Sequence, residues 1–192
     1  MMAQTDPDLE AKKRTRGGRE RLLQAAADLF RVNRFAGTSL QMIADRLGVS
    51  KAAIYHHFKS RDDIIEALME PVFTDAEDAA VRLMALPRKE RAEAGRVFYA
   101  DFAVKHRDVI SSVFFDRLAL RAELSEKVDR LVDRLAAVLA RDSTCVEDAR
   151  ARLLIYGIGG IVAEPQQQSL KDDDLSDLIA NLVLGAEPAE KP

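Results

Sequence analysis

Residues 38–58 read TSLQMIADRLGVSKAAIYHHF, and their pattern predicts two short helices joined by a tight turn. Thr38 and Gln41 have the spacing of a capping box, which begins a helix. Gly48 suits the left-handed residue that ends this helix, and Ser50 is a favourable N-cap for the next one. Apolar residues follow one helical stripe between these points: Leu40, Ile43, Ala44 and Leu47. Two helices joined by a turn containing glycine are typical of a DNA-binding helix-turn-helix.

The second helix, residues 51–57, has a surface suited to a DNA groove. Ala52 and Ala53 are small enough for the backbone to approach bases closely, while Ile54 and Phe58 would anchor the helix inward. Polar groups come from Ser50, Lys51, Tyr55 and His56. An ordinary helical hairpin with a solvated polar face would share these features, so the motif alone leaves both interpretations open.

A longer series of residue types at fixed spacing lies within residues 19–66. Its members are Ala25, Ala26, Phe30, Phe35, Thr38, Ser39, Ile43, Ala44, Gly48, Val49, Ser50, Tyr55, His57, Phe58 and Arg61. In these residues the chain resembles the TetR family of transcriptional regulators. It departs from the family pattern at Arg34, where a glycine is usual, and at Arg61, where a lysine is usual. The first departure requires Asn33 or Arg34 to accept the turn geometry, which asparagine tolerates well; the second keeps the charge.

The resemblance implies an all-α fold. An N-terminal three-helix head would carry the helix-turn-helix, and a C-terminal helical bundle would serve dimerisation and effector binding. The expected function is that of a homodimeric, sequence-specific DNA-binding regulator: a repressor released from a palindromic operator by a small molecule. Its recognition helices would reach successive major grooves. Expected phosphate contacts are Thr38, Tyr55, His56, Lys59 and Arg61, and expected base contacts are Ser50, Lys51 and Ala53.

Charge is distributed unevenly along the 192 residues, although the net charge is only −3. Residues 1–61 carry 12 Lys and Arg against 6 Asp and Glu, whereas residues 62–192 carry 17 against 26. A basic N-terminal part is what attraction to phosphate requires. A simple basic arm would give the same asymmetry.

The chain divides into four predicted parts. Residues 1–16 have almost no apolar residues and are expected to be a disordered basic arm, either lying along DNA or only aiding solubility. Residues 17–66 form the DNA-binding domain, residues 67–186 the helical body, and residues 187–192 a disordered tail. The expected helices are residues 18–32, 60–84 with a kink at Pro71, 89–104, 108–115, a long helix from 116 or 122 to 140, 146–164 and 172–184.

Two kinds of site are expected in the body by resemblance to the family. Candidate effector-pocket residues are Phe98, Phe102, Phe114, Phe115, Leu118 and Tyr156, which favour an apolar or aromatic ligand, although each also fits a plain core. Candidate dimer-interface residues are Ile158, Ile161, Leu178 and Leu182. Gly157, Gly159 and Gly160 each cost a helix about 1 kcal/mol relative to alanine, so we expect them to permit close packing within or between subunits.

Other functional classes find little support in the sequence. None of the common hydrolase, metalloprotease or nucleotide-binding motifs is present, the three histidines form no site, and GIGGIV lacks the third glycine of a dinucleotide loop. We therefore expect no enzyme activity, no cofactor and no metal. A single cysteine, Cys145, fits a reducing cytoplasm. The polar N-terminus has no apolar segment for a signal peptide, and no apolar run is long enough for a membrane span. A helical adaptor acting through protein contacts alone is the remaining alternative.

Overall fold

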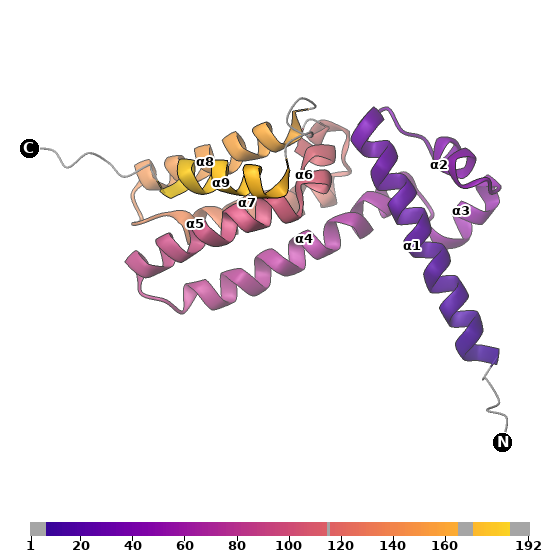
Figure 1. The fold of residues 1–192 in the computed structure, drawn as a ribbon, viewed down its shortest axis with the longest axis horizontal. Helices are drawn as coiled ribbons and strands as arrows, with labels where there is room; N and C mark the ends of the chain where they lie inside the picture. Colours follow the sequence, from indigo (N-terminus) through magenta and orange to yellow (C-terminus); the bar gives the residue numbers. More distant parts are fainter. Residues whose placement is uncertain (1–6, 115, 165–170, 185–192) are drawn as a thin grey trace, which may run out of the picture. The chain divides into compact units, whose positions relative to one another are not determined.

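The computed structural model describes residues 7–114, 116–164 and 171–184, and these residues are arranged entirely in helices and their connections. The prediction of an all-α fold is thus confirmed. The chain forms two compact units whose boundary follows Leu68, inside α4 (Arg61–Met84). Figure 1 shows the course of the helices within each unit.

The N-terminal unit contains α1 (Pro7–Asn33), α2 (Leu40–Leu47), α3 (Lys51–His57) and the first two turns of α4. Its core is made of side chains at most 5% exposed: Leu22, Ala26, Phe30, Phe35, Ile43, Ala44, Ile54, Phe58, Ile64 and Ile65. The rings of Phe30 and Phe35 meet edge to face with centroids 5.4 Å apart, a favourable aromatic geometry. These apolar residues hold the short helices α2 and α3, which would not be stable alone.

The first helix begins earlier than predicted. It includes residues 7–17, which we expected to lie almost entirely in a disordered arm because they have so few apolar residues. Residues 8–14 are nevertheless rich in helix-favouring Glu, Ala, Lys and Arg. Extending a helix that is already packed from Leu22 onward costs little compared with nucleating a new one. Residues 1–6 and the predicted tail, residues 187–192, lie outside the described residues.

The turn after α1 takes a shape that only some residues permit. Arg34 has a φ of 62°, so of the two candidates Asn33 and Arg34 it is Arg34 that adopts the left-handed conformation. A Cβ at Gly37 would lie 2.2 Å from the carbonyl oxygen of Asn33. Glycine is therefore required at position 37. The left-handed position, residue 34, is occupied by arginine where the family usually has glycine.

The C-terminal unit continues α4 and adds α5 (Arg88–Lys105), α6 (Arg107–Phe114), the 3₁₀ turn η1 (Arg117–Ala119), α7 (Ala122–Leu139), α8 (Cys145–Ala163) and α9 (Asp172–Leu184). Each predicted helix is present within about two residues of its expected ends. Within this unit α5 packs against α7 and α9, and α8 packs against α6 and α7 (Figure 1). Pro71 lies inside α4, which continues to Met84 as predicted.

Close helix approach in this unit depends on glycine at two points. A Cβ at Gly95 would lie 2.7 Å from Cγ1 of Val138, and a Cβ at Gly159 would lie 2.9 Å from the ring of Phe114. Both distances are shorter than van der Waals contact, so a side chain would push α5 from α7 and α8 from α6. The expectation that glycines in α8 permit packing is thus confirmed within the subunit for Gly159. Nothing lies within 4 Å of a Cβ at Gly157.

Candidate DNA-binding surface and body cavity

The two helices of the motif are capped as a helix-turn-helix requires, with one change from the prediction. Gly48 has a φ of 65° and its N–H donates to carbonyls in the last turn of α2, as expected for a left-handed cap. Ser50 caps α3 by accepting from the N–H of Ala53 at 3.3 Å. The cap of α2, however, is Ser39, which accepts from the N–H of Met42 at 3.2 Å. The capping box that we predicted from Thr38 is therefore wrong, because Thr38 lies one residue too early.

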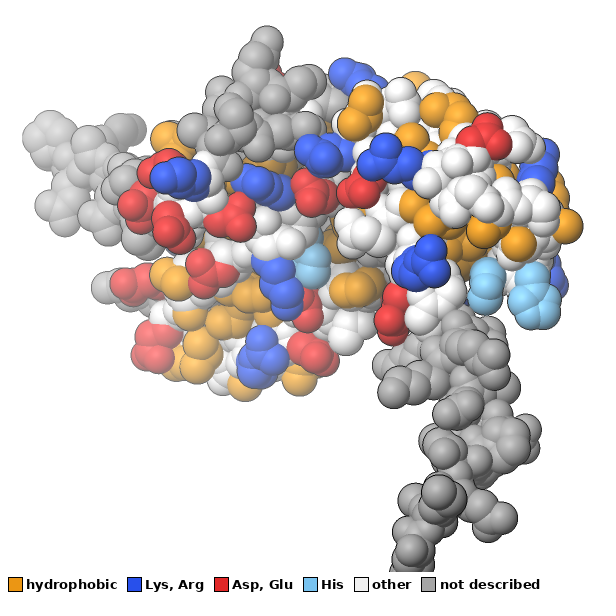
Figure 2. All heavy atoms as spheres, turned by 45° about the vertical axis from the view of Figure 1, so that its right-hand side comes forward, with side chains coloured by type: hydrophobic (Ala, Val, Ile, Leu, Met, Phe, Trp, Pro, Cys, Tyr) orange, Lys and Arg blue, Asp and Glu red, His pale blue; other side chains and the backbone are white. Residues whose placement is uncertain are grey.

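The exposed face of α3 combines small and polar side chains. Ile54 and Phe58 are buried and fix the helix to the unit. The predicted contact residues Lys51, Ala53, Tyr55 and His56 are all exposed. The ammonium of Lys51 lies 5.8 Å from the centroid of the Tyr55 ring, so the two side chains share one surface. The neighbouring rings of His56 and His57 meet edge to face with centroids 5.4 Å apart. Histidine side chains are drawn in pale blue in Figure 2.

Thr38 does not lie on this surface. Its side chain is 1% exposed, and its Oγ1 donates to the carbonyl oxygens of Arg34 at 2.9 Å and Leu29 at 3.3 Å. A buried hydroxyl that already donates inside the unit cannot reach a phosphate. Thr38 instead ties the turn to the end of α1, and its predicted phosphate contact is wrong.

Arg61 also has a structural role that the sequence did not reveal. Its Nη1 donates to the carbonyl oxygens of Phe35, Ala36 and Thr38 at 3.0, 3.2 and 2.9 Å, and its guanidinium lies 4.2 Å from the centroid of the Phe35 ring. The α1–α2 turn leaves these carbonyls without helical partners, so a planar cation satisfies several at once. We therefore assign Arg61 to the turn, and Lys59, whose side chain is exposed, is the cation beside it that faces solvent.

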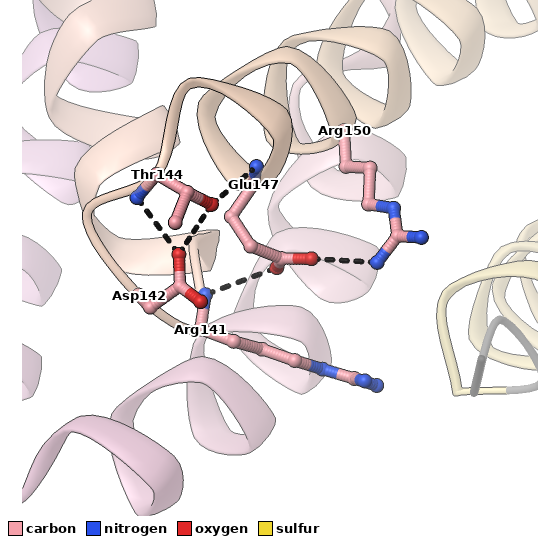
Figure 3. Close-up of polar contacts among 5 residues, drawn as sticks. All are labelled: Arg141, Asp142, Thr144, Glu147 and Arg150. Atoms are coloured by element: carbon pink, nitrogen blue, oxygen red, sulfur yellow. Dashed lines mark hydrogen bonds and ion pairs between the residues drawn. The ribbon is translucent and has the colours of Figure 1, made fainter. Parts of the chain in front are cut away.

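A second polar cluster, at the beginning of α8, is built for stability (Figure 3). The carboxylate of Glu147 is buried and accepts from the backbone N–H of Arg141 at 3.3 Å and from Nη1 of Arg150 at 2.7 Å. Thr144 caps the helix and donates to Asp142 through its hydroxyl and its N–H. These bonds from Thr144 are the main reason that the pKa of Asp142 is lowered. These bonds tie the connection before α8 to the first turn of that helix.

The C-terminal unit contains a mostly apolar cavity of about 160 Å³ between α4, α5, α6, α7 and α8. Its wall includes Met69, Val72, Tyr99, Phe102, Ile110, Val113, Phe114, Arg117, Val128, Leu131, Val132, Leu135, Ile155, Tyr156 and Gly159. The hydroxyl of Tyr99 is buried and donates to the carbonyl oxygen of Ile155 at 3.0 Å, and burial raises the pKa of this phenol. A concave apolar space with few polar groups is typical of small-molecule sites.

Three of the six predicted pocket residues line this cavity: Phe102, Phe114 and Tyr156. Phe98 packs against Phe102 with centroids 5.3 Å apart but does not line the cavity. Leu118 is fully exposed on η1, so its prediction is wrong; the 3₁₀ turn faces it outward. Phe115 lies outside the described residues. Tyr99 was not among the predicted residues, although it lies on the same helical face as Phe102, three residues away.

Arg117 is the charged residue that sequence reasoning also missed in the cavity wall. Its Nη2 is paired with Asp129 of α7. Burial lowers the pKa of Arg117, but hydrogen bonds to Asp129 and to Tyr156 raise it further, so the net shift is upward. Arg117 is therefore a permanent cation at the edge of an apolar space.

The predicted dimer residues divide between core and surface. Ile158 is 3% exposed within a single chain, so its prediction as an interface residue is wrong: it is a core residue of α8. Ile161 is half-buried, Leu178 is 42% exposed, and the side chain of Leu182 is outside the described residues. An exposed apolar stripe does run along α8 through Val146, Leu153 and Gly157, one or two helical turns apart.

Two further observations concern the described part of the chain. Among these residues we find no group of three His, Cys, Asp or Glu placed to hold a metal ion. A search of the same residues for a helix that is both long and apolar enough to cross a membrane finds none.

Comparison with known proteins identifies a family for the N-terminal unit. Residues 22–68 match the model for "Bacterial regulatory proteins, tetR family". The HTH-type transcriptional repressor KstR2 of Mycolicibacterium smegmatis is 25% identical over 121 residues, 62% of this chain and 58% of that protein. The HTH-type transcriptional activator FasR of the same organism is 24% identical over 162 residues, 81% of this chain and 73% of that protein. The alignment thus spans less than two thirds of KstR2.

The fold of most of the chain is also shared with solved structures. The TetR family transcriptional regulator PfmR from Thermus thermophilus matches with a TM-score of 0.66 at 21% identity, over 88% of this chain and all of that one. At this identity the similarity shows the fold alone. The relatives KstR2 and FasR are both named as transcriptional regulators. Family model, relatives and fold agree with the residues of the helix-turn-helix, and residues 22–68 form the DNA-binding domain of the tetR family of bacterial regulatory proteins.

Proposed function

We propose that this protein is a homodimeric repressor that binds a palindromic operator through α3 and leaves it when a small molecule enters the cavity of the C-terminal unit. The observation that carries the proposal is the face of α3. Lys51, Ala53, Tyr55 and His56 are exposed on a helix that Ile54 and Phe58 fix from behind. Such a helix presents polar groups and small side chains to base edges while its backbone stays rigid.

The proposed DNA contacts are of two kinds, to base edges and to phosphates, according to the position of each residue along α3 or next to it. Ser50, Lys51 and Ala53 lie at the beginning of α3 and are assigned to base edges, because recognition helices enter the groove with their N-terminal residues. Tyr55, His56 and Lys59 are assigned to phosphates, which fix the register. Thr38 and Arg61 support the turn and are not included.

Dimerisation is assigned to the stripe on α8 together with Leu178 of α9. Leu153 is 73% exposed, and an exposed apolar stripe of this kind marks an interaction surface. Gly157 is exposed, and nothing lies near the position of its missing Cβ, so a helix of a second subunit would have room to approach there. This surface replaces the one that we predicted around Ile158.

Coupling between cavity and DNA is assigned to α4. Met69 and Val72 of this helix line the cavity, and Arg61 of the same helix holds the turn before α2. A ligand needs only to prefer the conformation that does not bind DNA, since its differential affinity sets the size of the shift. Coupling of about 1–3 kcal/mol would weaken operator binding roughly 5- to 150-fold.

The names of the relatives include both a repressor and an activator of transcription. KstR2 is named a repressor and FasR an activator, and we favour repression because it needs only occupation of the operator. A gel shift with DNA from upstream of the chain's own gene tests the proposal at several salt concentrations. Salt-sensitive, sequence-specific binding by a dimer is expected. Absence of binding would instead favour a helical adaptor.

Leu153→Glu provides the matched test of the dimer surface. The carboxylate would lie in the apolar contact and is expected to give a folded monomer with weak operator binding. Leu118→Glu is the control, because Leu118 is equally apolar and fully exposed but lies on η1. Sedimentation of both variants should show a monomer only for Leu153→Glu. Two dimeric variants would place the interface elsewhere.

A further inference from the structure

The polar groups of the cavity wall are few and gathered at one place. Tyr99 already donates its hydroxyl to Ile155, so this group is committed to the fold. The remaining side chains with strongly polar atoms are Arg117 and Tyr156, and the Tyr156 hydroxyl contributes to the raised pKa of Arg117. The cavity thus combines an apolar interior with one guanidinium and one phenol.

The existing partner of Arg117 is held weakly. Asp129 is 59% exposed, and it is not part of the cavity wall. An ion pair with a well-solvated carboxylate contributes little, because water competes for both charges. Asp129 can return to solvent at small cost, whereas Arg117, which is 27% exposed, gains from a less solvated anion.

We propose that the cavity binds a monocarboxylic acid with an apolar body, whose carboxylate replaces Asp129 on Arg117 and accepts a further hydrogen bond from Tyr156. The inference rests on the proposed effector function and gives the chemical class of the ligand. A guanidinium binds a carboxylate through two parallel hydrogen bonds, which fixes its orientation. The apolar body would occupy the space among Phe102, Phe114 and their neighbours.

Other classes of ligand fit less well. A dianion would bury a second charge for which the wall offers no second cation. A cationic ligand would be repelled by Arg117. A neutral ligand would gain apolar burial but would leave the pair of Arg117 with Asp129 unchanged, so it would not be selected by the polar end.

Calorimetry of the full chain with four probes tests the inference. Octanoate and octanamide have the same body and differ in charge, and phenylacetate and phenylacetamide do the same for an aromatic body. Each acid is expected to bind roughly 10- to 100-fold more tightly than its amide, which is the range for hydrogen bonds to charged groups. The better acid identifies the aliphatic or the aromatic source.

Three variants locate the effect. Arg117→Gln should abolish the preference for acid over amide. Asp129→Asn removes the competing carboxylate and should strengthen binding of the acids but not of the amides. Arg152→Gln is the control, because Arg152 pairs with Asp133 of α7 in a similar way but does not line the cavity. Its acid preference should equal that of the unmodified protein.

Several outcomes would overturn the inference. These are equal affinity for acid and amide, an acid preference that survives in Arg117→Gln, or no binding of any probe. If Arg117→Gln does not fold by circular dichroism, unchanged acid affinity in Asp129→Asn would overturn it alone. A gel shift on the same samples separates this failure from failure of the proposed function, since DNA binding does not depend on which ligand the cavity accepts.

Discussion

The two units differ in how narrowly their function restricts their residues. In the N-terminal unit the turn between α1 and α2 must be held in one shape. Arg34 adopts its left-handed conformation and Gly37 avoids a clash with the backbone. Thr38 and Arg61 donate hydrogen bonds to its carbonyl oxygens. In the C-terminal unit the main requirement is that helices pack, and many apolar combinations satisfy it. Gly95 and Gly159 are exceptions, because a particular neighbour leaves no space.

This difference explains why the sequence pattern of the family is detected in the N-terminal unit and not in the C-terminal unit. The family model matches residues 22–68, which is almost the extent of the N-terminal unit. DNA presents the same groove and phosphate spacing to every protein that reads it, whereas many apolar combinations can pack a helical body. The difference can be tested by substitutions that are matched across the two units.

The largest effect is expected for Phe35→Ala. Phe35 is fully buried, meets Phe30 edge to face and lies beneath Arg61, so its loss leaves a cavity and removes the aromatic surface on which the guanidinium rests. The free energy of unfolding should fall by about 3–5 kcal/mol in a denaturant titration. Val32→Ala, at a residue 74% exposed, should change it by less than about 0.5 kcal/mol. Similar values for the two variants would mean that Phe35 does not organise the unit.

A smaller effect is expected in the C-terminal unit for Gly159→Ala. The added methyl would lie 2.9 Å from the Phe114 ring, so α6 or the ring must move, at a cost of about 1–3 kcal/mol. Gly160→Ala is the matched control, because its Cβ would lie 3.6 Å from the same ring, an ordinary contact. That variant should be stabilised by up to about 1 kcal/mol through helix propensity. Thermal unfolding compares the two, and equal melting temperatures would contradict the assigned close approach.

The contrast also shows which parts of the molecule could be predicted from the sequence. Helix ends were predictable in the C-terminal unit because apolar periodicity, Pro87 and the polar run after Pro165 mark them without tertiary information. The exposed face of α3 was predictable because Ile54 and Phe58 define which side is buried. The helical state of residues 7–17 was not, since it depends on extension from a packed helix.

The roles of individual side chains were harder to predict where tertiary partners decide them. The sequence pattern of the family does not show whether the Thr38 side chain faces DNA or the end of α1. Its hydrogen bond to the carbonyl oxygen of Leu29, nine residues away, decides this. The same holds for Arg61, whose partners lie 23 to 26 residues away. Periodicity placed Ile158 on an apolar face of its helix but did not show whether the same chain or a second subunit covers that face. Arg117 could not be assigned to a cavity because helices far apart in sequence form that wall.

The distinction between Lys51 and Arg61 gives a prediction of about 1 kcal/mol in operator affinity. Lys51→Gln should lower the slope of log K against log salt by about 0.9, the value for one phosphate contact, or leave the slope and relax base preference if Lys51 reads guanine. Arg61→Gln should reduce stability without changing the slope, because its Nη1 is directed at backbone carbonyls. Gel shifts over a salt series measure both. A reduced slope for Arg61→Gln would restore it to the DNA surface.

The smallest effect concerns charge in the C-terminal unit, where packing is expected to outweigh ion pairing. Asp75 of α4 accepts from Lys105 at 2.5 Å and lies 2.8 Å from Nε2 of His106, and these hydrogen bonds, the Lys105 bond first, lower the pKa of Asp75. A lowered carboxyl pKa in the folded state stabilises the protein at pH values above the unfolded pKa near 3.8, and this contribution is lost as pH falls through the folded value. Because the Asp75 side chain is 32% exposed, the contribution should be below about 1 kcal/mol. Asp75→Asn should therefore lower the free energy of unfolding slightly at pH 7, and the difference from the unmodified protein should shrink toward pH 3. Asp101→Asn, an exposed carboxylate of α5, is the control and should show no such convergence. A difference for Asp75→Asn as large as that for Gly159→Ala would mean that this ion pair, and not helix packing, sets the stability of the unit.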